Sequence, residues 1–464
     1  MNYLSNTTPL IKRNYFIIML NILGIVFYFN FWEEVPLYSS GDSIGYVELS
    51  NQINNGFDAN HYLKNTNLFR TLGYPFILSI LNFHENPKLL FFIQLISHFF
   101  SATLIFFLLK RFYSSNLLTI VFFFYMILPI YVQHTAYILT ESFSQLFLIL
   151  GLLFFTKYID GTKFQSFMFL SFSVISFSIA ALIRPTFQLL PIGFLFLIIL
   201  LLFVEKKHKY IYDSLIILFS ATLVLGSYSY YNKSNFNFTG ISPSLGAYLS
   251  IKTTKIIEDI PIEYSDIKEV LVEQRNLDLV KPNSSHTGKM YIWKAIPILK
   301  KKLNLNFIEL SKKLKDINYH LIKNNPLDYI LNVFESSIGF WFPNVLPIVF
   351  FESMLLKIIF NILHFTIIGV YFSSFIFLFY SVIMLYIIDR NRLIKFLNNN
   401  KSKIITIIFS NYIIAYTFLV SIFFEAGNPR HRIPTDLIIL FCVFITIKIS
   451  HILFSVKDAY YKPS

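Results

Sequence analysis

Long apolar runs separated by short polar stretches make up most of this chain. Between Lys88 and Lys110, for example, no Asp, Glu, Lys or Arg occurs. Runs of about 18 or more residues with almost no charge predict membrane-spanning helices. Inside lipid every backbone amide must be paired within its own segment, so spans of this length should be helical. Barrel strands would alternate apolar and polar residues over about ten positions, and these runs do not.

The pattern predicts an all-α polytopic membrane protein with about 10–12 transmembrane helices. The ten clear runs are 15–31, 89–109, 117–131, 138–156, 164–182, 186–204, 211–230, 359–388, 404–424 and 433–454. The apolar piece 72–83 is too short to cross a hydrocarbon core of ~30 Å, so we interpret it as interfacial. The stretch 327–351, broken by Gly339, Pro343 and Pro347, is compatible with a re-entrant, interfacial or kinked segment.

The runs divide the chain into three parts. Residues 1–230 form an N-terminal transmembrane module, which we expect to be the catalytic part, with a first external loop at 32–88. Residues 231–326 hold the one long polar segment, expected to be a small extracytoplasmic domain or a set of surface helices. Residues 327–464 supply the C-terminal transmembrane helices.

Charge indicates how the spans are oriented. The chain has 464 residues, of which 14% are charged, and a net charge of +13, whereas soluble domains carry about 25% charged residues. The basic clusters lie at 12–13, 110–111, 157–163, 206–209, 390–403 and in the C-terminal tail. If the spans alternate in direction, all of these fall on one side, which should be cytoplasmic. We therefore expect a bacterial inner-membrane protein with both termini in the cytoplasm and an uncleaved first span.

The same alternation gathers polar residues on the opposite face. Asp42, the stretch 133–141, Arg184 and the cluster 425–432 each lie at or near the end of an apolar run. We hypothesise that they meet in one extracytoplasmic cavity. No Lys/Arg-rich helix or RNA-binding motif accompanies the positive charge, so we expect no nucleic acid partner.

Two carboxylates in this set could carry chemistry. Asp42 follows the first span among small residues and could deprotonate a hydroxyl or hold a divalent cation; alternatively, it caps the next helix. Glu141 begins a span, and a carboxylate at membrane depth marks a functional site by default, unless it only complements the helix dipole. His134 lies two helical turns earlier, but further metal ligands are not visible.

Arginines at the same face suit a phosphate. Arg70 precedes a Gly-Tyr-Pro turn, Arg184 separates two spans, and Arg430 and Arg432 precede the last span. Guanidinium groups bind phosphate bidentately, although each could instead anchor to lipid headgroups by snorkelling. No Walker A, Rossmann or HExxH motif is present in the sequence, so a substrate delivered through the membrane is favoured over a nucleotide.

Taken together, these short motifs resemble the polytopic C-type glycosyltransferases, and specifically the group similar to dolichyl-phosphate-mannose–protein mannosyltransferases and the bacterial aminoarabinose transferase. The order and spacing agree over nearly the whole chain. The matching elements are Asp42-Ser43-Ile44-Gly45-Tyr46, Arg70-Thr71-Leu72-Gly73-Tyr74-Pro75, Thr140-Glu141-Ser142, Arg184-Pro185 and Arg430 to Pro434.

The resemblance implies transfer of a sugar from a polyprenyl-phosphate donor to a glycan, lipid or protein acceptor at the extracytoplasmic face. It implies Asp42 as the catalytic carboxylate, with Glu141 supporting the acceptor or a metal. The residues expected to bind substrate are Tyr46, Arg70, Tyr74, His134, Arg184, Arg430 and Arg432. Ser43 replaces an acidic residue of the family pattern, which leaves open whether a divalent metal ion is a cofactor.

Two other functions remain compatible with the sequence. A flippase or transporter for a lipid-linked sugar would need paired repeats or interrupted helices, and no obvious internal repeat is present. A polysaccharide polymerase or ligase would share the face and the arginines, but Asp42 directly after the first span favours the transferase.

Overall fold

The computed structural model describes residues 8–31, 41–113, 128–280, 290–342 and 354–458. Within these ranges every regular element is a helix and no strand occurs. Eight described helices are long and apolar enough to cross a membrane, which confirms the expected all-α polytopic membrane protein. The spans are Pro87–Lys110, Glu141–Asp160, Phe164–Ile183, Pro185–Phe203, Lys209–Phe236, Asn361–Ile387, Lys401–Phe424 and Pro429–Leu453.

Two further predicted spans have a different outcome. Helix α1 (Thr8–Phe31) lies at the edge of the bundle, and its stretch Ile17–Asn30 is apolar. The predicted span 117–131 lies almost wholly outside the described residues, and residues 343–351 of the stretch 327–351 lie outside them as well. Of that stretch, the structure describes helix α17 (Pro326–Trp341).

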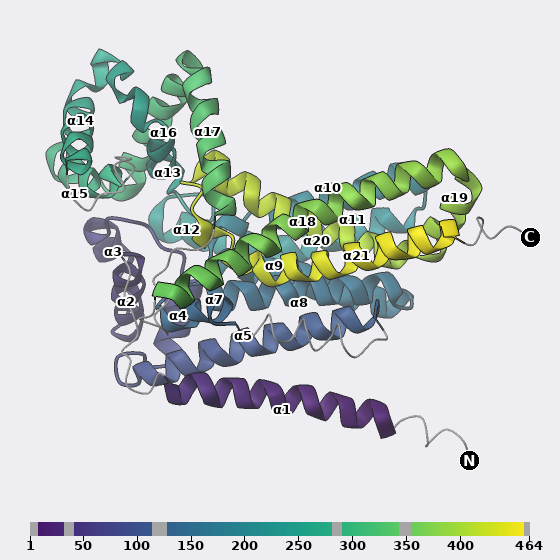
Figure 1. Cartoon of the computed structure of the whole chain (residues 1–464). Coiled ribbons are helices and arrows are strands. Elements are labelled where there is room, and N and C mark those ends of the chain that lie inside the picture. The colour runs from purple at the N-terminus through teal and green to yellow at the C-terminus, as the bar shows by residue number, and fades with distance from the viewer. Residues whose placement is uncertain (1–7, 32–40, 114–127, 281–289, 343–353, 459–464) are drawn as a thin grey trace, which may run out of the picture.

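The bundle is built around helix α8 (Glu141–Asp160), which packs between α5 (Pro87–Lys110) and α9 (Lys163–Ile183) (Figure 1). Small residues allow α8 and α9 to approach closely, as is usual between membrane helices. Gly151 of α8 faces the ring of Phe177 with no room for a Cβ, and Ser173 donates a hydrogen bond to the Gly151 carbonyl at 2.8 Å.

The remaining membrane helices complete the bundle. They are α10 (Leu190–Glu205), α11 (Lys209–Ala221), α12 (Ser227–Phe236), α18 (Met354–Ile388), α20 (Lys401–Phe424) and α21 (Asp436–Asp458), with the short amphipathic helix α19 (Arg390–Asn399) between α18 and α20. Helix α21 packs along α18 and α20.

The polar segment folds into a helical unit at one end of the bundle (Figure 1). Its helices are α13 (Leu245–Lys252), α14 (Ser265–Leu279), α15 (Tyr291–Leu303) and α16 (Phe307–Asn324). They share one apolar core with residues of the first external loop, among them Leu49, Tyr62 and Phe69. The polar segment and the first loop are therefore packed as one layer over this end of the bundle.

The first loop itself forms α2 (Gly41–Asn54), α3 (Ala59–Asn65) and α4 (Gly73–Ile80). Helix α4 has eight residues, too few to cross a bilayer core. Its first residue, Gly73, lies against the last turn of α9, where a Cβ would stand 2.5 Å from the Leu182 carbonyl oxygen. This close approach brings the segment before α4 next to the residues that follow α9.

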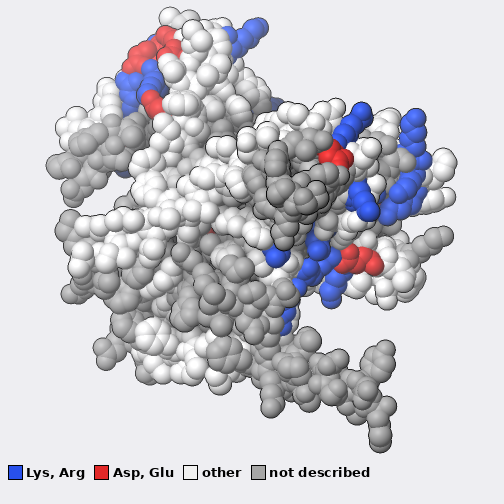
Figure 2. Space-filling model, turned by 45° about the vertical axis from the view of Figure 1, so that its right-hand side comes forward, with Lys and Arg blue, Asp and Glu red and all other residues white. Residues whose placement is uncertain are grey.

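The opposite end of the bundle carries the basic loops. Arg111 forms an ion pair with Asp160, and Ser402 donates a hydrogen bond to Asp160 at 2.6 Å. Lysine and arginine side chains gather at this end in the space-filling view (Figure 2). Because α8 runs from Glu141 to Asp160, and 20 residues of helix measure about 30 Å, the two ends are separated by roughly the thickness of a hydrocarbon core.

Candidate functional site: a pocket of paired carboxylates and arginines

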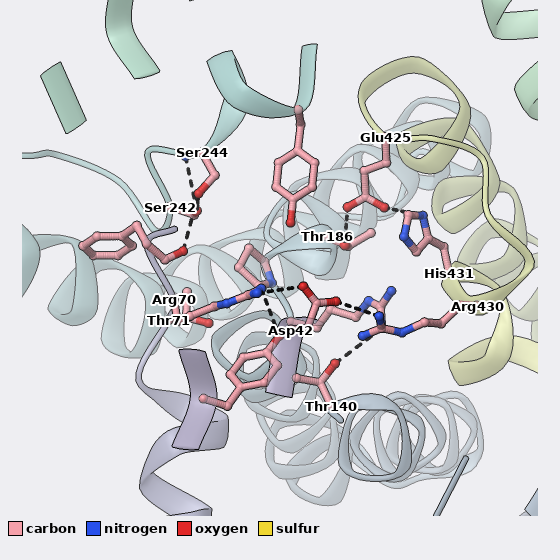
Figure 3. Close-up of a pocket in the computed structure, with 15 residues that line it drawn as sticks. Asp42, Arg70, Thr71, Thr140, Thr186, Ser242, Ser244, Glu425, Arg430 and His431 are labelled. Atoms are coloured by element: carbon pink, nitrogen blue, oxygen red, sulfur yellow. Dashed lines mark hydrogen bonds and ion pairs between the residues drawn. The ribbon is translucent and has the colours of Figure 1, made fainter. Parts of the chain in front are cut away.

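Two arginines hold the carboxylate of Asp42 (Figure 3). Arg70 Nη2 donates to Asp42 Oδ1 at 2.7 Å, and Arg430 Nη1 donates to Oδ2 at 2.6 Å. Asp42 lies in the first turn of α2, Arg70 in the segment between α3 and α4, and Arg430 in the turn before α21. The structure therefore brings together residues that are 388 positions apart, on the side that alternating spans predict.

A second carboxylate, Glu141, completes the network. Its Oε1 accepts hydrogen bonds from Arg184 Nη1 at 2.9 Å and from Arg430 Nε at 2.6 Å. Arg430 thus bridges Asp42 and Glu141 through two different nitrogens. Glu141 is fully buried, and its Oε2 has no hydrogen-bond partner among the described residues. One carboxylate oxygen is therefore left to receive a further donor.

Local sequence explains these positions. Asp42 and Glu141 both lie in the first turn of a helix, where the dipole favours negative charge. Arg184 ends α9 because Pro185 follows it, and the residue before a proline is driven out of the helical conformation; its φ and ψ are −138° and 106°. The side chain then turns back to Glu141 instead of continuing along the helix.

A third carboxylate lies beside the first two. Glu425 directly follows α20, and its Oε1 accepts from the Thr186 hydroxyl at 2.9 Å. Its Oε2 lies 2.6 Å from His431 Nδ1, which is also 3.0 Å from the Ser421 hydroxyl. Gly427, with φ at +64°, allows the tight turn that places His431 and Arg430 on this side, because a positive φ favours glycine.

These groups surround a small polar pocket (Figure 3). Its walls come from the ends of N-terminal and C-terminal membrane helices, from the first loop and from the polar segment. The lining residues are Asp42, Tyr46, Phe69, Arg70, Thr71, Thr140, Arg184, Pro185, Thr186, Ser242, Ser244, Tyr248, Glu425, Arg430 and His431. Its volume is about 70 Å³, enough for a few water molecules but too little for a sugar phosphate.

Cationic neighbours control the charge of Asp42 and Glu425. Burial by itself would raise the pKa of Asp42, but the nearby charges of Arg70 and Arg430 outweigh it and hold that pKa well below its ordinary value. Burial also opposes ionisation of Glu425, yet His431, Arg184 and the Thr186 hydrogen bond lower its pKa to about 2. Both carboxylates are therefore ionised at neutral pH.

Five of the nine residues predicted from the sequence line this pocket: Asp42, Tyr46, Arg70, Arg184 and Arg430. The Tyr46 ring lies under the Arg70 guanidinium, with the carbon 4.6 Å from the ring centroid. Glu141 joins through its bonds to Arg184 and Arg430.

The other three predicted residues lie outside the pocket. Tyr74 is fully buried behind Tyr46, with ring centroids 5.0 Å apart, and its hydroxyl donates to Gln94 at 3.2 Å. His134 is buried against His98, with ring centroids 5.3 Å apart. Arg432 directs its guanidinium away, toward Asp436 and the end of α17.

Sequence reasoning missed several lining residues. Thr140 and Thr186 are direct neighbours of Glu141 and Pro185, so proximity to the predicted residues was a usable signal. Ser242, Ser244 and Tyr248 belong to the polar segment, and the turn formers Ser242-Pro243-Ser244 gave no indication that this segment folds over the pocket.

The donor set does not suit a divalent cation. Both Asp42 oxygens accept from arginines, and three guanidiniums face two carboxylates in the network. Among the described residues, no group of three or more His, Cys, Asp or Glu side chains is arranged to hold a metal ion. Guanidinium groups instead suit an anion that replaces a carboxylate as their hydrogen-bond partner.

Fold and site together define a polytopic helical membrane protein with a buried carboxylate–arginine pocket at one end of its bundle. Comparison of the chain with protein-family models, with curated proteins and with solved structures finds no match. The pocket itself is therefore the main indication of function.

Proposed function

We propose that this protein is a membrane glycosyltransferase that moves a sugar from a polyprenyl-phosphate donor to an acceptor hydroxyl at the extracytoplasmic face. The observation that supports it most directly is the pocket in which Arg70, Arg184 and Arg430 converge on Asp42 and Glu141. Three guanidiniums gathered around a carboxylate at the membrane edge suit a reaction in which a lipid phosphate leaves and a hydroxyl loses its proton.

The orientation is part of the proposal. The basic loops at 110–111, 206–209 and 390–403 face the cytoplasm, since short cytoplasmic loops carry the excess of Lys and Arg. The pocket, about 30 Å away along α8, then opens on the extracytoplasmic side of a bacterial inner membrane. There a lipid-linked donor can enter from the bilayer and an acceptor from the aqueous phase.

Donor binding would rearrange the ion pairs. The pocket volume of about 70 Å³ requires the side chains to separate before a phosphate enters. The phosphate takes over hydrogen bonds that Arg70 and Arg430 now give to Asp42. Loss of these two cationic partners raises the pKa of Asp42 toward its ordinary range, so that the carboxylate becomes a stronger base only when the donor is present.

The transfer step is then a direct displacement. The acceptor oxygen attacks the anomeric carbon, and a new glycosidic C–O bond forms while the bond from that carbon to the phosphate oxygen breaks. The acceptor proton moves to Asp42, and the polyprenyl phosphate leaves with the electron pair, its charge stabilised by the arginines. Glu141 holds Arg184 and Arg430 in place.

The test is Asp42→Asn, which preserves shape but removes the base. The rate of sugar transfer should fall by roughly 10²–10⁴-fold. Cells producing this variant should therefore lack the glycan that mass spectrometry finds in the envelope of cells producing the wild-type protein. The matched control is Asp58→Asn. Asp58 caps α3, accepting from the backbone amides of Asn60 and His61, and asparagine caps helices equally well.

A fully active Asp42→Asn protein would rule out the assigned role. Equal amounts of both variants in the membrane, measured after detergent extraction and size-exclusion chromatography, separate loss of chemistry from loss of folding. If no envelope glycan depends on the wild-type protein at all, the transferase proposal fails as a whole.

A further inference from the structure

A second pocket lies at the basic end of the bundle, far from the carboxylate–arginine pocket. It is formed where the ends of α8 and α10 meet the beginnings of α11 and α20 and the last residues of α19. The lining residues are Phe155, Tyr158, Ile159, Ile198, Leu201, Lys207, Lys209, Tyr210, Asn398, Asn399, Lys401, Ser402 and Ile405. Its volume is about 430 Å³, within the range of small-molecule sites.

The pocket is divided by polarity. Its floor is apolar and comes from the membrane-spanning helices, with Phe155 and Ile198 buried and Leu201 partly buried. Its rim carries the exposed lysines Lys207 and Lys401.

A third lysine, Lys209, is also exposed and extends over the rings of Tyr158 and Tyr210, at 5.4 and 5.1 Å from their centroids. No acidic residue lines this pocket, but two carboxylates lie directly behind it: Asp213 accepts from the Tyr158 hydroxyl and Asp160 from the Ser402 hydroxyl, both at 2.6 Å. The rim therefore carries three lysines, and the floor offers hydrocarbon contact.

We propose that this pocket binds an anionic glycerophospholipid. The phosphate diester would lie among Lys207, Lys209 and Lys401, and the first carbons of the acyl chains would lie on the floor at Leu201 and Phe155. Charge complementarity and the position of the pocket at a bundle end both favour this occupant, because basic pockets between membrane helices bind anionic headgroups at this depth. The inference is independent of the proposed transferase activity.

A lipid bound at this site would contact residues of α8, α10, α20 and the start of α11. The rim lysines come from the loop before α11 and from the start of α20, while the floor comes from α8 and α10. A bound headgroup that contacts lysines from separate parts of the chain would link these helices only in the folded state. Binding should therefore stabilise the folded protein.

The experiment measures the thermal unfolding of the full-length protein in detergent. The probes are dioctanoyl phosphatidylglycerol, dioctanoyl phosphatidylcholine and glycerol 3-phosphate at equal concentrations. The test variant is Lys207→Gln with Lys401→Gln. The control is Lys206→Gln with Lys395→Gln, which removes the same charge from exposed lysines at the same end of the bundle that do not line the pocket.

We expect phosphatidylglycerol to raise the unfolding temperature of the wild type and the control by several degrees, and that of the test variant by less than half as much. Phosphatidylcholine and glycerol 3-phosphate should each have a much smaller effect. Equal shifts in the test and control variants would overturn the proposal. An equal shift with phosphatidylcholine would reduce it to general lipid solvation, and one with glycerol 3-phosphate would indicate a site for free phosphate.

A second variant guards against misfolding of the first. Leu201→Trp fills the floor while keeping all three lysines. It should abolish the phosphatidylglycerol shift if acyl chains enter the pocket. A full shift in this variant would show that the lipid binds elsewhere, which also overturns the proposal.

Discussion

Two arginines that are separated by one residue lie in very different surroundings. Arg430 bonds to two carboxylates, each of which also has a second arginine, and it faces a pocket. Arg432 is fully buried and donates to Asp436 at 2.9 Å, to the carbonyls of Phe340 and Phe342 at 2.6 and 3.0 Å, and lies 2.8 Å from His364 Nε2.

The difference is one of partners. The partners of Arg432 lie in α18 and α21 and at the end of α17, so this side chain joins three helices. The partners of Arg430 are carboxylates, which an incoming phosphate could replace. Burial and charge alone therefore do not distinguish the two arginines, whereas the pocket and the replaceable carboxylate partners of Arg430 do.

The largest expected effect is on stability, and it separates the two arginines. Arg432→Gln should reduce the free energy of unfolding by about 3–5 kcal/mol, because it leaves the buried Asp436 without its cation and two carbonyls without donors. Arg430→Gln should cost less, since Asp42 keeps Arg70 and Glu141 keeps Arg184. Thermal unfolding of both variants in detergent measures the difference. A lower unfolding temperature for the Arg430 variant would reverse the comparison.

The next effect is on transfer. Arg430→Lys should slow the appearance of the envelope glycan by about a hundredfold, the typical loss when one transition-state donor is removed. A lysine ammonium is a single point and cannot bridge Asp42 and Glu141 as the planar guanidinium does through Nη1 and Nε. The control is Arg275→Lys in α14 of the polar segment, where Arg275 pairs with Glu258. Normal transfer by Arg430→Lys would contradict the bridging role.

The sequence predicted much of the architecture because lipid allows few solutions. Eight of the ten predicted runs coincide with long apolar helices, since backbone groups in hydrocarbon can be paired only within a helix or a closed barrel. The alternation of basic loops also predicted that Asp42 and Arg430 lie at the same end. That inference needs only the parity of the spans and no knowledge of packing.

The details of the pocket could not be predicted in this way. Arg430 and Arg432 occupy the same short motif, and only tertiary contacts distinguish them. Tyr74 follows Arg70 closely in the chain, yet at the start of α4 its ring packs behind that of Tyr46. Tyr248 reaches the pocket only because the polar segment packs on the first loop, and its sequence has no periodic signal that would reveal this contact.

The smallest expected effect is a change of stability with pH. Its size is set by how far water reaches each carboxylate. The side chain of Asp42 is 35% exposed and that of Asp436 is 8% exposed, so the pocket should exchange protons more readily than the Arg432 cluster. In the folded protein the pKa of Asp42 lies well below its ordinary value and that of Glu425 is about 2. The unfolded chain therefore takes up these protons first as the pH falls.

Stability from these two groups should be complete above about pH 5 and decline between about pH 5 and pH 2. Thermal unfolding across this range should show a shallower decline for Glu425→Gln than for the wild type. Asp42→Asn should flatten the curve less, because solvent screens a group that is one third exposed. If both variants follow the wild-type curve, the paired carboxylates do not exist as such in solution, and the contrast between the pocket and the Arg432 cluster loses its electrostatic basis.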